Sequence, residues 1–292
     1  MTKVLVTAAA GDTGRPTVAR LLEKGFAVRA FVRKDDARAQ ALRDLGAEIW
    51  LGDLASLRDV RLATNGAQRA YLCCAIGEGI VEHTAIFAQA AKEHGLELIV
   101  NMSHKQSRPN ARSKVTQDHW LSEQILDRSG VPVVHLRPTF FAEWLLYISG
   151  VIRYGRYIMP FNKDSRFAPI AAADIAKIVA AIMDAPARYV GKSLQLHGPV
   201  ELSHEELAAE VGRVLGKNLA FEQVTPSVFL ETLGIAGATV LRKHFEAVAI
   251  DQQEGLIAGT DTIGREIIGG PLTTIEAFIN ANRPAFEPLA GC

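Results

Sequence analysis

The chain has 292 residues, of which 48% are hydrophobic and 22% charged, as is typical of a globular protein with a sizeable core. Its 32 basic side chains balance 32 acidic ones, so no net field favours nucleic acid or an anionic membrane as a partner. Cys73, Cys74 and Cys292 have neither a disulfide-framework nor a zinc-ligand spacing, and no stretch approaches the roughly 20 apolar residues of a membrane span. We therefore expect a cytoplasmic protein without a metal site.

Short β-branched runs alternate with amphipathic segments over the first 136 residues. Apolar residues in the amphipathic segments recur at spacings of three and four, and a glycine often follows, as at a helix C-cap. Nearly continuous apolar strands separated by helices predict a parallel sheet covered on both faces. We expect strands over Lys3–Thr7, Ala27–Val32, Ala47–Leu51, Arg69–Cys74, Leu96–Asn101 and Pro132–Leu136. We expect helices over Thr13–Lys24, Asp35–Leu45, Leu57–Asn65, Ile80–His94 and Lys114–Ser129.

The pattern loosens after Pro138. We expect helices over Phe140–Tyr154 and Ala172–Ala185, strand-like segments over Arg156–Pro160, Arg166–Ile170 and Ser193–His197, and a helical remainder with one strand at Leu219–Val224. The sequence thus predicts a doubly wound, Rossmann-type α/β fold with a smaller, mostly helical C-terminal lobe. Residues 1–140, with 166–198 interleaved, are expected to form the dinucleotide-binding domain, and residues 141–165 and 199–292 the smaller lobe.

A glycine-bearing turn joins the first strand to the first helix, and it reads AAAGDTG from Ala8 to Gly14. In dinucleotide-binding folds, glycines at this junction let the backbone turn sharply, bring amides to the pyrophosphate and let the helix pack on the strand. Gly11 and Gly14 suit the last two roles. Ala8 suits the first only with a negative φ, which the spacing of the turn allows. A strand–turn–helix unit without a ligand is the alternative.

The end of the second strand indicates which dinucleotide binds. It reads Phe31-Val32-Arg33-Lys34, with no acidic residue to accept a hydrogen bond from a ribose 2′-hydroxyl. Arg33, assisted by Lys34 or Arg15, suits a 2′-phosphate, which favours NADP(H) over NAD(H); a merely solvated Arg33 is the alternative. Asp53, at the end of the third strand, can meet the adenine amino group. The expected cofactor-binding residues are Thr7, Ala8, Gly11, Asp12, Thr13, Gly14, Arg33, Lys34, Asp53, Leu54 and Ala75.

Further stretches follow the turn in a fixed order along the chain: VRAFVRK, GDLAS, NMS, LSEQILDRSGVPVVHLRPTFFAEW, FAPIAAADIAKIV and IGREIIGGPLTTIEAFINAN. With these stretches and VTAAAGDTG, the chain resembles the NmrA-like family of atypical short-chain dehydrogenase/reductases. The resemblance implies a Rossmann domain with a small C-terminal lobe and NADP(H) binding. It implies either reductase activity or redox sensing without catalysis, and no single substrate.

The catalytic pair of ordinary short-chain reductases is missing from the sequence. These enzymes use Tyr-x-x-x-Lys on a helix, where the lysine lowers the pKa of the tyrosine that gives a proton to the substrate. None of the five tyrosines here has a lysine four residues on. In an alignment anchored on Glu123, Val115 and His119 occupy the tyrosine and lysine positions. The absence of the pair makes turnover the open question.

Four polar residues near the expected cleft are the remaining catalytic candidates. Ser103 can hydrogen-bond a substrate oxygen, His104 or His119 can donate a proton because imidazole exists in both forms near neutral pH, and Lys105 can neutralise an oxyanion or touch the cofactor. The alternatives are a loop cap for Ser103, a surface position beside Asp118 for His119, and one charge in a basic loop for Lys105.

Aromatic residues indicate where a substrate binds. Trp120, Phe140, Phe141 and Trp144 predict a pocket for a flat or apolar ligand, with packing between the lobes as the alternative. We therefore expect an NADPH-dependent oxidoreductase that transfers a hydride to a small apolar molecule, a cyclic or aromatic carbonyl, quinone or conjugated compound. The alternative is a non-catalytic NADP(H)-binding redox sensor that acts through a protein partner; a homodimer is compatible with either function.

Overall fold

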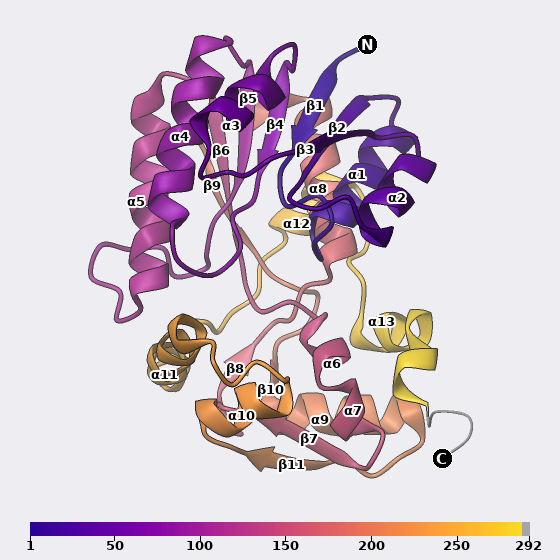
Figure 1. Cartoon of the computed structure of the whole chain (residues 1–292). Coiled ribbons are helices and arrows are strands. Elements are labelled where there is room, and N and C mark those ends of the chain that lie inside the picture. The colour runs from indigo at the N-terminus through magenta and orange to yellow at the C-terminus, as the bar shows by residue number, and fades with distance from the viewer. Residues whose placement is uncertain (288–292) are drawn as a thin grey trace. The chain divides into compact units, whose positions relative to one another are not determined.

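Seven strands form the central sheet of the computed structural model, which describes residues 1–287 (Figure 1). Their order is β3-β2-β1-β4-β5-β6-β9, and the five pairings from β3 to β6 are parallel. This order is that of dinucleotide-binding α/β folds, so the predicted Rossmann-type fold is confirmed. The strands are β1 (Lys3–Val6), β2 (Ala27–Val32), β3 (Glu48–Leu51), β4 (Arg69–Leu72), β5 (Leu98–Met102), β6 (Val133–Pro138) and β9 (Ser193–Leu196).

Helices cover both faces of this sheet (Figure 1). On one face α3 packs against α4 and α4 against α5, and on the other α1 packs against α8. Side-chain caps fix several starts: Asp36 accepts from the Arg38 and Ala39 amides, Ser56 from the Asp59 amide. The helices are α1 (Gly14–Glu23), α2 (Ala37–Asp44), α3 (Leu57–Thr64), α4 (Ile80–Glu93), α5 (Lys114–Ser129) and α8 (Ala172–Asp184), with a short 3₁₀ turn at Pro186–Arg188.

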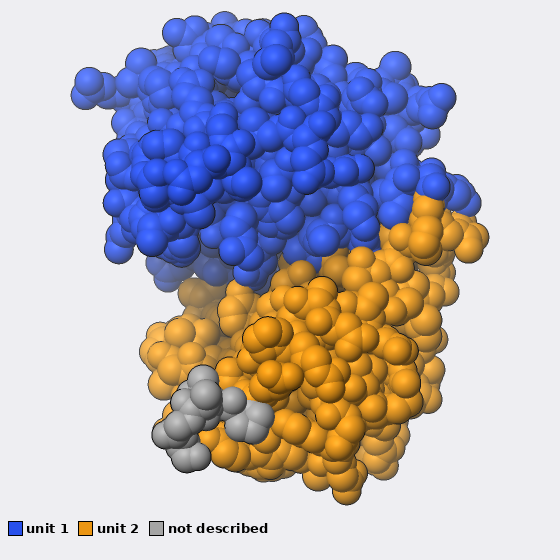
Figure 2. Space-filling model, turned by 90° about the vertical axis from the view of Figure 1, so that its right-hand side faces the viewer, with its two compact units in different colours: residues 1–137, 172–195, 266–269 blue, residues 138–171, 196–265, 270–292 orange. Residues whose placement is uncertain are grey.

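The chain divides into two units, coloured separately in Figure 2. Unit 1 comprises residues 1–137, 172–195 and 266–269, and it contains most of the sheet with its helices. Unit 2 comprises residues 138–171 and 196–265 and, within the described part of the chain, 270–287.

Cys292 lies outside the described residues. No helix in residues 1–287 is long and apolar enough to cross a membrane, and no cluster of three or more metal-ligating side chains occurs there.

Unit 2 is built around aromatic side chains rather than around a large sheet. Its two small sheets pair β7 with β11 in parallel and β8 with β10 antiparallel. Phe161, Phe229 and Phe245 are buried in one core, where Phe161 and Phe229 each contact Phe245 edge to face. Its elements are α6 (Trp144–Tyr147), α7 (Ser149–Ile152), β7 (Arg156–Met159), β8 (Arg166–Phe167), β10 (Leu202–Ser203), α9 (His204–Leu215), β11 (Ala220–Gln223), α10 (Pro226–Thr232), α11 (Thr239–Gln253), α13 (Ile275–Ala281) and a 3₁₀ turn at Arg283–Phe286. The short helix α12 (Ile263–Ile268) has residues 263–265 in unit 2 and 266–268 in unit 1.

The single helix predicted over Phe140–Tyr154 is wrong. The Phe140 carbonyl accepts from the Ile170 amide, and the Ala142 amide donates to the Ile170 carbonyl, so the segment begins as a paired extended stretch. Ile148 then leaves the helical region, with φ −95° and ψ 9°, and separates α6 from α7. Its side chain is buried, so packing in the unit 2 core overrides the local helical pattern.

Candidate cofactor and active site

The turn between β1 and α1 has an unexpected conformation at Ala8. Its φ is +46°, the one positive φ among the described residues that are not glycine, so the negative φ on which its role in the turn was made to depend is not observed. The Ala8 carbonyl turns inward, where it accepts from the Gly11 amide at 2.9 Å. A left-handed alanine costs about 1–2 kcal/mol, so the rest of the turn must hold Ala8 in place.

Gly14 and Gly11 bring α1 close to this inward carbonyl. A Cβ built on Gly14 would lie 2.1 Å from the Ala8 oxygen, and one on Gly11 would lie 3.2 Å from it. At position 14, therefore, no amino acid other than glycine fits unless the backbone moves. The close approach is the helix-on-strand packing that the third glycine of a dinucleotide-binding turn provides.

Several amides at the start of α1 have no hydrogen-bond partner among the residues that the structure describes. The Arg15 amide donates to the Gly11 carbonyl, and Pro16 has no N–H to offer. Among residues 1–287, no carbonyl or side chain accepts from the amides of Ala10 or Gly14. Free amides at a helix N-terminus, with the positive end of the helix dipole, form a site for an anion such as a pyrophosphate. The residues present therefore fit a dinucleotide.

Two cations at the end of β2 form no ion pair within the described part of the chain. Arg33 and Lys34 are exposed, and neither has a carboxylate at ion-pair distance among the described side chains. The two acids that follow are already engaged: Asp35 pairs with Arg43 at 3.0 Å, and Asp36 caps α2 and pairs with Arg38. The guanidinium of Arg38 lowers the pKa of the Asp36 carboxyl, which stays charged.

The predicted adenine-side residues follow β3 and β4. Asp53 is exposed, and its carboxylate accepts from the Ala55 amide at 2.9 Å, which fixes its direction. Leu54 is half-buried and Ala75 exposed. Before Asp53, Gly52 lies so close to the Phe31 ring that a Cβ would be 2.7 Å from it. A second tight glycine thus supports the loop after β3, and no sequence motif pointed to it.

Ser103, at the end of β5, is fixed by a buried ion pair. Its hydroxyl donates to Glu123 at 2.6 Å, and Arg137 donates to both oxygens of the same carboxylate. Burial raises the pKa of Glu123, but the hydrogen bonds from Arg137 and Ser103 outweigh it and hold this pKa below its usual value. Glu123 is charged and accepts the hydrogen bond that the serine hydroxyl donates. Ser103 can therefore accept a hydrogen bond from a bound group but has no second proton to donate.

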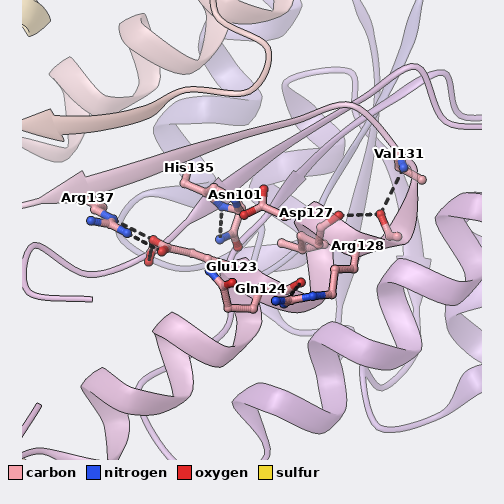
Figure 3. Close-up of polar contacts among 11 residues, drawn as sticks. Asn101, Glu123, Gln124, Asp127, Arg128, Val131, His135 and Arg137 are labelled. Atoms are coloured by element: carbon pink, nitrogen blue, oxygen red, sulfur yellow. Dashed lines mark hydrogen bonds and ion pairs between the residues drawn. The ribbon is translucent and has the colours of Figure 1, made fainter. Parts of the chain in front are cut away.

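A second polar contact lies beside this one between α5 and the same strands (Figure 3). Asn101 contacts Nδ1 of His135 at 3.1 Å, and Nε2 of His135 contacts Asp127 at 3.0 Å. Glu123 and Asp127 are four residues apart on α5 and therefore lie on one helix face. The sequence reasoning used Glu123 only to anchor an alignment and missed Arg137, because nothing in the local pattern links residues on different elements.

The histidines next to Ser103 are placed differently from the expectation. His119 is buried, 4% exposed, so the surface alternative is excluded. Burial lowers the pKa of His119 to about 4, which leaves it neutral near pH 7 and contradicts the expectation that both forms are available. Its ring stacks on His104 with centroids 5.9 Å apart, and His104 and Lys105 are half-buried. Ser103, His104 and His119 thus lie together at one place in unit 1.

Four aromatic residues were predicted to form a substrate pocket. Phe140, Phe141 and Trp144 line a cavity within unit 2, whereas Trp120 is a half-buried residue of α5 in unit 1. The cavity of about 10 Å³ has room for one water molecule. Two polar atoms of lining residues, the Tyr157 hydroxyl and Nδ1 of His204, are buried and have no hydrogen-bond partner among residues 1–287. The lining residues are Phe140, Phe141, Ala142, Trp144, Leu145, Tyr157, Met159, Phe167, Pro169, His204 and Leu207.

Cys73 and Cys74, at the end of β4, are free thiols. Burial raises the pKa of both, and that of Cys74 reaches about 12. A thiol that stays protonated is a poor nucleophile.

Fold and site together define a dinucleotide-binding protein of the Rossmann type. The model of the NmrA-like family matches residues 1–276, and the chain belongs to this family. It is 26% identical to an NAD(P)H azoreductase of Xenophilus azovorans over 97% of this chain and 99% of the relative. It is 25% identical to quinone oxidoreductase 2 of Escherichia coli K12 over 95% and 97%.

Solved structures share the fold. The NADPH complex of an Escherichia coli NADPH-dependent quinone oxidoreductase has a TM-score of 0.83 at 22% identity and covers 96% of this chain and 99% of its own. NmrA, a negative transcriptional regulator, in complex with NADP has a TM-score of 0.81 at 17% identity, with 100% and 98% covered. At these identities the likeness establishes the fold alone, and both an enzyme and a regulator share it.

Proposed function

We propose that the protein is an NADPH-dependent reductase of small apolar acceptors, a cyclic or aromatic carbonyl, quinone or conjugated compound. The observation that carries the proposal is the turn from Ala8 to Gly14, with its inward carbonyl and free amides at the start of α1. The names of the sequence relatives, an azoreductase and a quinone oxidoreductase, support reductase chemistry. Bound NADPH supplies the hydride.

Different residues of unit 1 bind the different parts of NADPH in this proposal. Ala8, Gly11 and Gly14 shape the pyrophosphate site, with Thr7, Asp12 and Thr13 beside them, and Asp53, Leu54 and Ala75 flank the adenosine. Arg33 and Lys34 meet the 2′-phosphate, because they are exposed cations without a carboxylate partner among residues 1–287. NADPH is accordingly preferred over NADH.

The polar group around Ser103 meets the reacting atoms. Ser103 accepts a hydrogen bond and orients a donor of the substrate or cofactor. His119 acts as a neutral imidazole, which can still polarise a carbonyl through an N–H, and His104 and Lys105 complete the group. In unit 1, Trp120 is the proposed apolar contact of the substrate, whereas the cavity lined by Phe140, Phe141 and Trp144 within unit 2 has room for one water molecule.

Titration calorimetry with NADPH and NADH tests cofactor binding and preference. Arg33→Gln is expected to weaken NADPH binding by about 10- to 100-fold, the range of one charge-assisted hydrogen bond, and to leave NADH binding unchanged. Arg188→Gln, another exposed arginine of unit 1, is the control. Equal affinity of the wild type for both nucleotides would remove the preference, and failure to bind either would remove the proposed function.

A second function, a redox sensor without turnover, is favoured by the absent Tyr-x-x-x-Lys pair and by the regulator among the structural neighbours. Measuring NADPH oxidation at 340 nm against quinones, azo dyes, ketones and imines separates the two. Oxidation with any class supports the reductase. Tight NADPH binding with no oxidation across the panel supports the sensor.

A further inference from the structure

Both ends of the turn between β1 and α1 form hydrogen bonds with residues at the end of β4. At the entry, the Thr7 hydroxyl donates to the Cys73 carbonyl at 3.0 Å and accepts from the Cys73 amide at 2.8 Å. At the exit, the Tyr71 hydroxyl donates to the Thr13 hydroxyl at 2.9 Å. Between these two ties lies Ala8, the residue with the strained φ.

Tyr71 is an unusual support because it is completely buried. Its exposed fraction is 0%, and burial raises the pKa of its phenol well above the ordinary value, so the hydroxyl keeps its proton and donates it. The acceptor, Thr13, is also buried and stands at the N-cap of α1 without capping it. The third residue of the helix is Pro16, which has no amide to be capped. The Thr13 hydroxyl therefore points inward to Tyr71 instead of toward the first turn of the helix.

The hydrogen bond from Tyr71 to Thr13 helps to hold the backbone that carries the free amides. A strained backbone conformation persists only where surrounding contacts hold it. Inside the turn, the hydrogen bond from the Gly11 amide to the Ala8 carbonyl is one such contact. On the side where the chain enters α1, next to the free amide of Gly14, the Tyr71 hydroxyl holds the Thr13 side chain, and the Thr17 hydroxyl donates to the Thr13 carbonyl at 2.6 Å.

We propose that Tyr71 is a positioning residue for the cofactor: by holding Thr13, it keeps residues 8–14 in the conformation that binds a dinucleotide pyrophosphate. The inference rests on the proposed NADPH site. Tyr71 touches no cofactor atom in this role and acts through the turn.

The first test is the affinity of Tyr71→Phe for NADPH, measured by calorimetry. We expect a loss of about three- to tenfold, the range that one neutral hydrogen bond supplies. Thr13→Val removes the same bond without altering the core ring, and it should show the same loss even if the Tyr71 variant does not fold. Tyr189→Phe is the matched control, because the Tyr189 hydroxyl has no hydrogen-bond partner among the described residues.

Two readouts separate positioning from a general loss of stability. The competitor 2′-AMP carries the 2′-phosphate but no pyrophosphate, so Tyr71→Phe should leave its affinity unchanged. Ala8→Gly removes the strain that the tie holds, because glycine adopts positive φ readily, and it should restore most of the NADPH affinity in the Tyr71→Phe background. Unchanged NADPH affinity in both single variants, an equal loss for 2′-AMP, or no rescue by Ala8→Gly would each overturn the proposal. Failure of the wild type to bind NADPH would instead refute the proposed function.

Discussion

Gly14→Ala is the substitution whose effect the structure determines most directly. The new Cβ would lie 2.1 Å from the Ala8 oxygen and 2.8 Å from two further backbone atoms, whereas ordinary Cβ contacts begin at 3.4 Å. Neither side can yield easily, because Ala8 is already strained and α1 is packed against α8. The start of α1 must therefore withdraw by about 1 Å, which costs about 1–3 kcal/mol of unfolding free energy, as overpacking does.

The same withdrawal removes the free amides from the pyrophosphate. Loss of two charge-assisted hydrogen bonds weakens binding by at least about a hundredfold, so NADPH affinity should fall far more than stability does. Calorimetric titration and urea unfolding of the same preparations measure the two effects. Gly150→Ala is the control, since a Cβ there meets no atom within 4 Å. If Gly14→Ala binds NADPH within threefold of the wild type, the assignment of this turn to the cofactor is refuted.

Two further predictions concern buried ionisable groups. His119 has a pKa near 4 when folded and 6.5 when unfolded, so its contribution to stability is complete above pH 6.5 and is lost as the pH falls toward 4. Urea unfolding across this range should give a pH-dependent loss that His119→Asn reduces by up to about 3 kcal/mol; identical pH profiles would contradict burial of a neutral imidazole. Arg137→Gln leaves the buried Glu123 charge unpaired, and it should cost about 3–5 kcal/mol, partly recovered when Glu123→Gln is added. Additive losses would show that the two side chains do not interact.

The parallel sheet could be predicted because its signals are local. Each of β1 to β5 is a short run followed by a helix, and right-handed crossovers leave few ways to order such units. The prediction failed where long-range contacts decide the backbone. Phe140 and Ala142 pair with Ile170, and Ala8 adopts a positive φ because Gly14 closes on its carbonyl. Neither contact leaves a trace in the few residues around it.

The candidate site was predictable in its residue types but not in their hydrogen bonds. Gly11, Gly14 and Arg33 could be proposed from the sequence because a turn and a strand end require such residues at fixed places. The state of Ser103 depends on Glu123, 20 residues further on, and on the rotation of α5 over the sheet. Such a partner can be identified only after the packing is known, and it reverses the hydrogen-bonding role that the sequence suggested for the serine.

The altered catalytic positions bear on the class of acceptor. Val115, at the place of the usual tyrosine, is buried and has no proton to give, and His119, at the place of the lysine, is neutral near pH 7. The Ser103 hydroxyl already donates its hydrogen bond to Glu123. A simple ketone needs an acid as negative charge develops on its oxygen, whereas a quinone or extended conjugated acceptor delocalises that charge and can take its proton later from water. We therefore expect the residues proposed for this site to suit conjugated acceptors better than isolated carbonyls, so quinones and azo compounds come first in the substrate panel.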